Sequence, residues 1–155
     1  MRRKDRELNL KDDIQEIIKL GDVCRVAMFA GEYPYIIPLN YGYEWSEQLK
    51  LYFHSATEGR KVDLLKLNNN VGFEIDINHE LVTADEACNW GMKYKSVVGF
   101  GKMIEIASNK EKVHALDLLM EHYGFKGKPL YPAIMLMKIR IYCLEVCNIT
   151  GKART

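Results

Sequence analysis

The residues best suited to chemistry stand together in one stretch, residues 54–67. Arg60 and Lys61 follow Gly59 at the predicted start of a helix, and Ser55 and Thr57 precede them in a short polar turn. The first amides of a helix have no intrahelical partners, and the helix dipole makes that end slightly positive. An arginine can hold a phosphate through two hydrogen bonds, and a lysine adds a point charge. The stretch therefore predicts a phosphate site; an ordinary strand-to-helix connection with solvated basic residues is the alternative.

The elements that would position these residues are visible in the pattern of apolar residues. Residues 49–53 alternate as in a strand, and residues 62–67 place four apolar side chains largely on one side of a helix. The chain is thus expected to run strand, glycine-containing turn, helix, with the basic pair at the mouth of the helix.

Composition limits the function classes. The chain has 155 residues, 48% hydrophobic and 28% charged, with a net charge of +1. These values predict a single globular domain over residues 1–155, without the broad basic surface that nucleic acid requires. The basic run at residues 1–6 is interpreted as a solvated terminus. No apolar run is long enough to span a membrane, and no signal-peptide pattern is present, so we expect cytoplasmic residence.

Metal chemistry is not indicated. The four cysteines form no C-x-x-C pair, and the four histidines have no metal-ligand spacing. Cys24, Cys143 and Cys147 lie in apolar runs, where reduced cysteine behaves as a small hydrophobe.

The rest of the chain predicts a mainly antiparallel α+β fold. Helices are expected at residues 10–20, capped by Asn9 and ended by Gly21, and at residues 109–123. The run Asn68, Asn69 and Asn70 is expected to close the helix after the basic pair, because asparagine tolerates the left-handed conformation. Residues 78–89 are interpreted as a loop, and several consecutive strands suggest a closed barrel. The strands are expected at residues 23–30, 33–43, 49–53, 71–77, 94–106 and 134–146, the last followed by a polar tail.

Pro38 interrupts the second of these strands. Because proline cannot donate to a ladder, it belongs at an edge or a bulge. Backbone groups left free there could contact a flat polar ring; alternatively, the proline protects an edge strand against aggregation.

Four segments together resemble a known family. Residues 35–42, 51–56, 59–61 and 94–97 are similar to the nitroimidazole-resistance proteins, within the pyridoxamine 5'-phosphate oxidase-like group of FMN-binding split barrels. The resemblance covers residues 24–152. It implies a split β-barrel with peripheral helices and a homodimer that binds two FMN molecules in clefts at its interface.

The resemblance also implies roles for individual residues. Arg60 and Lys61, beside Gly59, match the basic pair on the FMN phosphate. His54 matches a strand-end position beside the phosphate and ribityl chain, and a histidine at this type of position has been given a catalytic role. A neutral imidazole bonded to phosphate or backbone is the alternative for His54. The remaining cofactor contacts implied are Ser55 beside the phosphate and ribityl chain, Ile37, Pro38, Leu39 and Asn40 along the ring, and Lys95, Ser96 and Val97 at its polar edge.

The resemblance favours an FMN-dependent reductase. NAD(P)H would be a transient electron donor, and a flavin or a nitroaromatic compound the small-molecule acceptor. Tyr35, Tyr41, Met28 or Met92 are candidates to line the acceptor pocket, and Trp90 to cap the ring or pack at the interface. A non-catalytic flavin or haem carrier of the same fold, or a structural dimer whose basic turn merely binds sulfate, are the alternatives. The oxidase proper has a basic residue at the start of the strand matched to residues 36–40, which this chain lacks, so binding of pyridoxamine phosphate is not expected.

Overall fold

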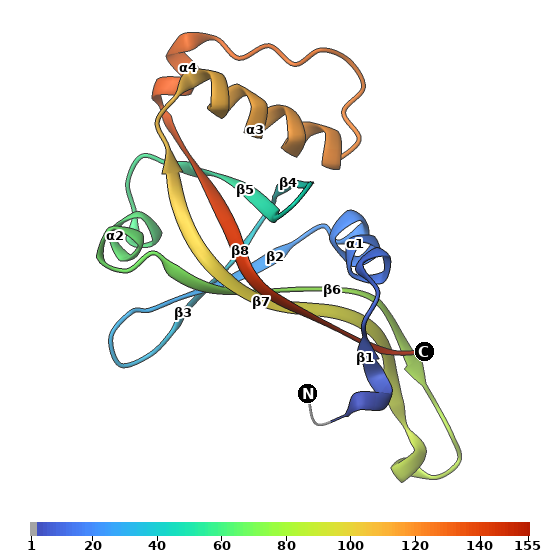
Figure 1. Cartoon of the computed structure of the whole chain (residues 1–155). Helices are drawn as coiled ribbons and strands as arrows, with labels where there is room; N and C mark the ends of the chain where they lie inside the picture. The colour runs from blue at the N-terminus through green and yellow to red at the C-terminus, as the bar shows by residue number, and fades with distance from the viewer. Residues whose placement is uncertain (1–2) are drawn as a thin grey trace.

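The computed structural model describes residues 3–155, which form one strongly curved antiparallel sheet with helices packed around it (Figure 1). The strands are β1 Glu7–Leu8, β2 Cys24–Met28, β3 Tyr35–Leu39, β4 Gly42–Trp45, β5 Leu49–Ala56, β6 Asn70–Val82, β7 Gly91–Ile106 and β8 Ile139–Arg154. The helices are α1 Lys11–Leu20, α2 Arg60–Leu67, α3 Asn109–His122 and α4 Ala133–Met137, with 3-10 turns at Lys4–Arg6 and Ala87–Asn89. This architecture confirms the predicted α+β split barrel.

The strand order explains why the sheet closes on itself. The hydrogen-bonded order is β3-β2-β6-β7-β8-β5-β4, so β3 and β4 are the two outer strands. Only Asn40 and Tyr41 join them along the chain. Two residues span only a few ångströms, so the sheet must curl until its edges meet. No hydrogen-bonded pairing between β3 and β4 is found among the described residues, so the predicted closed barrel is instead split along this line.

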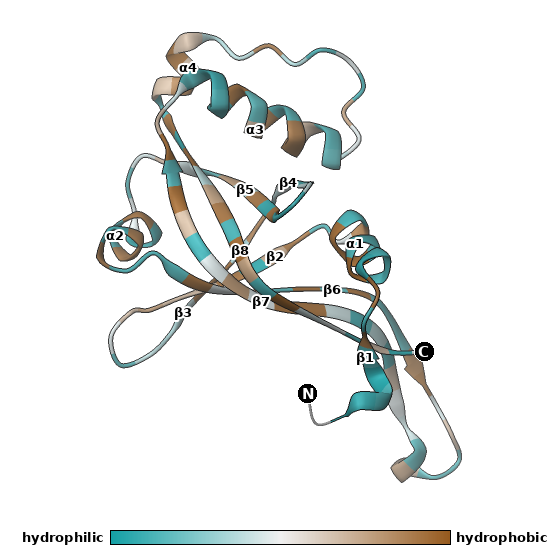
Figure 2. Ribbon diagram, in the orientation of Figure 1, coloured by the Kyte–Doolittle hydropathy of each residue, from teal (hydrophilic) through white to brown (hydrophobic). Residues whose placement is uncertain are grey.

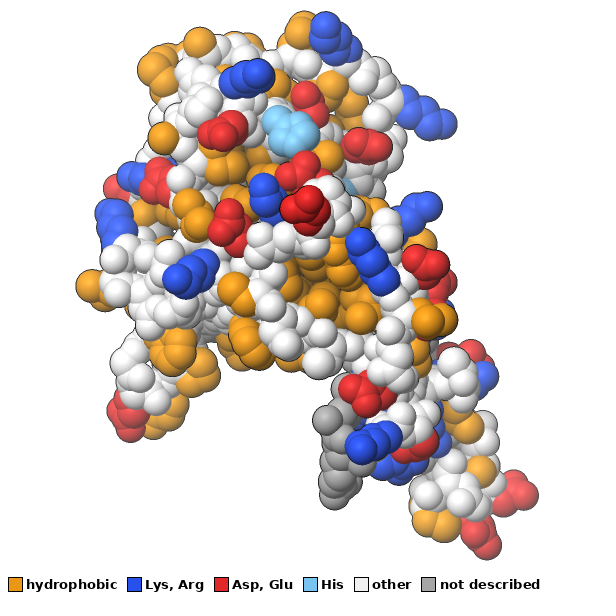
Figure 3. Space-filling model, in the orientation of Figure 1, with side chains coloured by type: hydrophobic (Ala, Val, Ile, Leu, Met, Phe, Trp, Pro, Cys, Tyr) orange, Lys and Arg blue, Asp and Glu red, His pale blue; other side chains and the backbone are white. Residues whose placement is uncertain are grey.

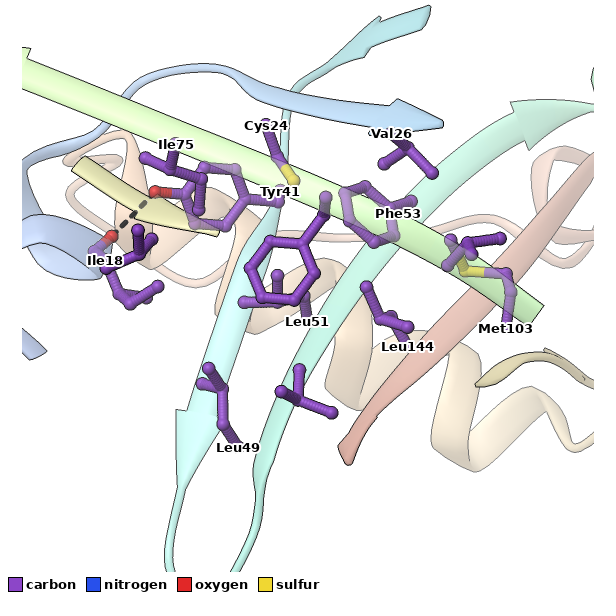
Figure 4. Packing of buried hydrophobic residues seen from close by; sticks show 14 of the residues in the cluster. Ile18, Cys24, Val26, Tyr41, Leu49, Leu51, Phe53, Ile75, Met103 and Leu144 are labelled. Carbon is purple, nitrogen blue, oxygen red and sulfur yellow. Dashed lines mark hydrogen bonds between the residues drawn. The ribbon is translucent and has the colours of Figure 1, made fainter. Parts of the chain in front are cut away.

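Tyr41 is the reason that the predicted strand 33–43 is two strands. Its side chain is fully buried, and its hydroxyl lies 2.7 Å from the carbonyl oxygen of Ile18 and 3.0 Å from that of Gly21 (Figure 4). The chain turns inward at this residue and then continues on the opposite edge of the sheet. A regular alternation of apolar residues cannot reveal such a turn.

The core lies inside the barrel, where inward-facing side chains meet the apolar side of α1. Ile17 and Ile18 of α1 are fully buried against residues such as Phe53 and Leu144. Each fully buried side chain of this size contributes about 1.5–3 kcal/mol. A smaller cluster, which includes Tyr52, packs the outer face of the sheet beneath α3. Figure 2 shows the matching alternation of hydrophobic and hydrophilic bands along α3.

Long strands replace two predicted irregular segments. β6 continues to Val82 and pairs with β7 in a long hairpin that projects from the body at the lower right of Figure 1, so residues 78–82 are not loop. A register shift between Ile77 and Glu80, with Asn78 at φ 58°, breaks the alternation of apolar and polar residues from which this part of β6 could have been predicted. The loop proper is confined to residues 83–90.

The last strand is also displaced from its prediction. Residues 133–137 form α4, and β8 begins at Ile139 and runs through the polar tail to Arg154. Pairing with β7 on one side and with β1 on the other, as in Glu7 opposite Lys152, makes this polar segment a strand. Its sequence alone has little strand character.

The helix ends differ in detail from the expectations. α1 begins at Lys11 after Leu10, with no side-chain cap, so the assignment of Asn9 as cap is wrong. Gly21 ends α1 as predicted, its amide donating to the Ile17 carbonyl at 2.9 Å. Asn68 is extended at φ −151°, and Asn78 is the non-glycine residue with positive φ among the described residues, so the predicted left-handed conformation at residues 68–70 is wrong. Among the described residues, no helix is long and apolar enough to cross a membrane.

Candidate anion-binding site

The turn between β5 and α2, residues 57–61, has the geometry of an anion site. Gly59 has φ +126° and ψ 166°, a conformation essentially restricted to glycine. Its carbonyl accepts the amides of Val62 and Asp63 at 2.9 and 3.2 Å. The amides of Arg60 and Lys61 find no acceptor among the described residues. The predicted strand, turn and helix are confirmed, and the free amides point out of the first turn of α2.

Arg60 links this turn to the edge strand β3. Its guanidinium carbon lies 4.9 Å from the centroid of the Tyr35 ring. Such a cation–π contact contributes about 0.5–1 kcal/mol at an exposed position. Pro38 is three residues farther along β3, about 10 Å at the usual rise of a strand. The turn and the proline-containing edge strand are therefore neighbours, as the expected arrangement of phosphate and ring requires.

Lys61 is a partly buried cation without a counter-ion. No carboxylate of the described residues lies within 4.0 Å of it, whereas the α2 residue Lys66 pairs with Asp63 at 3.9 Å. Burial lowers the pKa of the Lys61 ammonium. An anion bound at the turn would offset this cost.

His54 and Ser55 point to opposite faces of β5. His54 is on the exposed side, and surrounding protein atoms, with a smaller contribution from the charge of Lys61, lower the pKa of its imidazole. The neutral form is therefore favoured near pH 7. Because successive residues of a strand alternate in direction, these two side chains would approach a ligand from different sides, and their placement beside a phosphate and ribityl chain stays a prediction.

Ser55 is the most informative residue of the site. Its side chain is on the inner face, with only 4% of the residue exposed. Its Oγ is buried and has no hydrogen-bond partner among the described residues. An unsatisfied buried hydroxyl costs about 1–3 kcal/mol. Native proteins rarely leave such a group unpaired, so this one requires an explanation such as a ligand or an ordered water.

Sequence reasoning missed Arg140. This β8 residue is directly opposite Ser55 in the sheet register. Its Nε donates to the carbonyl oxygen of Thr57 at 2.7 Å, and its Nη1 lies 2.5 Å from Oε1 of Glu105. The alternation of basic and apolar residues near Ile139 indicated a strand. Only the pairing of β8 with β5 places this guanidinium at the turn.

The β3 residues expected along a ring divide into two groups. Ile37 and Leu39 pack their side chains against the core, whereas Pro38 is exposed on the edge strand. The Asn40 amide donates to the carbonyl of Asp22 at 3.3 Å and to the Tyr123 hydroxyl at 3.0 Å. The Asn40 side chain thus forms its hydrogen bonds at the split between β3 and β4. The expected contact with a ring concerns only the Asn40 backbone and stays a prediction.

The segment 95–97 is not near the 57–61 turn within one chain. His54 is aligned through β8 with Ile106 of β7, and Lys95 is eleven residues back along β7, about 35 Å at 3.3 Å per residue. Lys95 pairs with Glu16 at 2.7 Å. Val97 is 0% exposed, so only its backbone is available to a ligand.

The candidates to line the acceptor pocket or to cap the ring lie in different parts of the fold. Tyr41 belongs to the core and lines no acceptor pocket. Trp90, half exposed near the tip of the β6–β7 hairpin, donates its Nε1 hydrogen to the carbonyl of Ala84 at 2.7 Å. Met28 is buried but borders an apolar pocket beside the β2–β3 hairpin. Met92 is exposed on the β6–β7 hairpin.

Comparison with known proteins agrees with this geometry. The sequence profile of the family described as "Pyridoxamine 5'-phosphate oxidase" matches residues 11–153. A candidate 5-nitroimidazole antibiotic resistance protein from Bacteroides thetaiotaomicron is 34% identical, with a TM-score of 0.83 over 95% of this chain and 86% of that one. An uncharacterised protein of Rhizobium meliloti is 28% identical over 92% of this chain and 91% of its own length.

More distant structures share the fold alone. The flavocytochrome Anf3 from Azotobacter vinelandii is 18% identical with a TM-score of 0.82, over 100% of this chain and 72% of that one. By its profile match and its 34% identity to a full-length relative, the chain belongs to the pyridoxamine 5'-phosphate oxidase-like family, where it resembles the nitroimidazole-resistance proteins.

Proposed function

We propose that the protein is an FMN-binding reductase whose phosphate site is the 57–61 turn. The observation that carries the proposal is the buried, unpaired hydroxyl of Ser55, which lies at the same end of the barrel as the free amides of α2. Lys61, without a counter-ion, supplies positive charge there. These groups fit a dianionic phosphate, because charge-assisted bonds to backbone amides and cations are among the strongest that proteins make.

A second copy of the chain is needed to complete the site. Lys95 is about 35 Å along β7 from the position aligned with the turn, so one FMN cannot contact both within a single chain. In a two-fold dimer, the 95–97 segment of one copy meets the turn of the other. The proposal thus retains both groups of expected residues and distributes them between two chains.

The outer face of the sheet supports this dimer. Ile36, Ala27, Gly72 and Phe100 are aligned across β3, β2, β6 and β7, and Ile36 and Phe100 are 60% and 57% exposed. Val98 on the same face is 53% exposed. Contiguous exposed apolar surface of this kind marks an interface. In Figure 3 the β2–β3 hairpin projects at the lower left and also presents hydrophobic side chains to solvent.

FMN supplies hydride and electron transfer, and the protein supplies binding and orientation. The free edge of β3 would position the ring, and Lys95 would supply a cation at its polar edge by exchanging its contact with Glu16 for one with the ring. NAD(P)H is the proposed donor, and a flavin or nitroaromatic compound the acceptor. His54 lies on the exposed side at the end of β5, where burial and the charge of Lys61 lower the pKa of its imidazole, so we propose that it forms a hydrogen bond to the phosphate or to the backbone.

The experiment is a titration of the purified apoprotein with FMN and with riboflavin, followed by flavin fluorescence. We expect wild type to prefer FMN, since riboflavin lacks the phosphate. Lys61→Ala should weaken FMN binding by about 1.5–3 kcal/mol, the contribution of a hydrogen bond to a charged group. Lys66→Ala is the matched control, because it removes the same charge from the far end of the same helix.

Two further measurements separate the remaining possibilities. The absorption spectrum of cofactor released on heating distinguishes a flavin from a haem. Steady-state oxidation of NADH and NADPH by the FMN-loaded protein tests turnover. Equal affinity for FMN and riboflavin would rule out the phosphate assignment. Flavin binding without NAD(P)H oxidation would favour a non-catalytic flavin carrier over a reductase.

A further inference from the structure

We infer that Arg140 is a positioning residue for the phosphate turn, held in place by Glu105, and that it does not bind the phosphate itself. The inference rests on the proposed function and adds to it a residue pair from β8 and β7. Both residues are distant in sequence from the basic pair, and neither belongs to the expected cofactor contacts.

The first step concerns the orientation of one peptide group. The Arg140 Nε donates to the Thr57 carbonyl at 2.7 Å. In a trans peptide the carbonyl and the following amide point in opposite directions. Fixing the Thr57 oxygen toward Arg140 therefore turns the Glu58 amide away from it. That amide has no acceptor among the described residues and precedes Gly59, so it continues the run of free amides at the start of α2.

The second step concerns the charge of Arg140. Its Nη1 is 2.5 Å from Glu105 Oε1, and the guanidinium is largely covered, with 29% of the side chain exposed. A cation already neutralised by a carboxylate attracts an anion only weakly. By contrast, no carboxylate of residues 3–155 lies within 4.0 Å of Lys61. Arg140 thus acts on the backbone of the turn, and Lys61 acts on the ligand.

The third step concerns what the pair prevents. The turn contains Gly59, whose conformational freedom is large, and no side chain caps α2. Without a fixed Thr57 carbonyl, the peptide groups before Gly59 can rotate and withdraw their amides from the anion. Part of the binding free energy is then used to order the turn, and the affinity for the anion falls.

The test compares FMN and riboflavin affinities of three variants. Arg140→Met removes the hydrogen bond to Thr57 at similar side-chain length, and we expect FMN affinity to fall about tenfold, because about one residue of the turn must then be ordered on binding. Riboflavin affinity should change little, because riboflavin has no phosphate that could bind at the turn. Arg140→Lys keeps a donor and should recover part of the FMN affinity.

Glu105→Gln decides between positioning and direct contact. If Arg140 is a positioning residue, loss of its carboxylate partner loosens it and FMN affinity falls. If Arg140 touches the phosphate, loss of the competing negative charge raises FMN affinity, and our inference is wrong. This variant keeps side-chain volume, so it remains informative should Arg140→Met fail to fold.

The outcomes also separate this inference from the proposed function. If wild type binds FMN and riboflavin with equal affinity, the assignment of the phosphate site is wrong, and so is the role of Arg140. If wild type prefers FMN and a folded Arg140→Met variant shows the same preference for FMN over riboflavin, only the positioning role of Arg140 is overturned. Equal loss of both ligands in Arg140→Met would show a general structural effect and would also overturn the inference.

Discussion

Replacement of Ser55 by alanine should have opposite effects on the stability of the apoprotein and on its affinity for FMN. The Oγ atom is buried on the inner face of β5 and has no partner among the described residues. No protein group among the described residues replaces the hydrogen bonds that this hydroxyl makes to water in the unfolded chain. In the complex, we propose that it donates to the ligand at the 57–61 turn.

The magnitudes follow from the two states of the hydroxyl. An unsatisfied buried polar group costs about 1–3 kcal/mol, so Ser55→Ala should stabilise the apoprotein by about 1 kcal/mol or more. For a chain of this length, 1 kcal/mol raises the melting temperature by about 2–4 °C. A lost hydrogen bond to a charged phosphate costs about 1.5–3 kcal/mol. Since 1.4 kcal/mol is tenfold in affinity, Kd should rise by between about tenfold and a hundredfold.

Urea unfolding of the apoprotein and calorimetric titration with FMN measure the two effects. Ser46→Ala is the matched control, because this serine is exposed in the turn before β5 and should leave both quantities within about 0.5 kcal/mol of wild type. A destabilised Ser55→Ala apoprotein would mean that the hydroxyl is satisfied in solution. Unchanged FMN affinity would mean that the ligand does not use it. Unchanged FMN affinity refutes the assignment of Ser55 to the phosphate, whereas a destabilised apoprotein refutes only the stability argument.

Two further predictions test the packing and the electrostatics. Gly42→Ala should destabilise the protein by about 1–3 kcal/mol in urea unfolding, because a Cβ there would lie 2.4 Å from the backbone nitrogen of Leu119 in α3. Gly72→Ala is its control, with no contact under 3.8 Å, and a similar loss there would contradict the steric argument. The imidazole pKa of His54, followed by NMR titration, should lie below about 6.5 and rise in Lys61→Met, since burial and then the lysine charge lower it. The lowered pKa means that the unfolded state binds the proton better, so this histidine makes the protein less stable as pH falls through about 6.5 and below. A His54 pKa unchanged by Lys61→Met would show that the lysine charge does not reach the ring.

Local sequence determined the elements whose structure depends on neighbouring residues. The order of strand, glycine turn and helix around Gly59 could be predicted because helix-end chemistry and apolar periodicity act within a few residues. The end of α1 at Gly21 followed for the same reason. The basic pair at the start of α2 was found from spacing alone, and the family resemblance added its ligand.

Tertiary structure decided everything that depends on which strands become neighbours. Whether Ser55 is satisfied depends on its burial inside a barrel, and the role of Arg140 depends on the register between β5 and β8. The resemblance placed the Asn40 backbone along a ring, and only the fold shows that its side-chain amide donates to the Asp22 carbonyl after α1 and to the Tyr123 hydroxyl. Pairing across the sheet also turned the polar tail after residue 146 into a strand.

The sequence by itself thus determined a strand, a turn and a helix with two cations at their junction, because each of these preferences acts through adjacent backbone and side-chain groups. Only the folded sheet decided that Lys95 and the 57–61 turn lie far apart in one chain, because their separation is set by strand register over the length of β7. The same register brings Arg140 to Thr57, eighty-three residues away, and leaves the Ser55 hydroxyl with no protein partner in the described part of the chain.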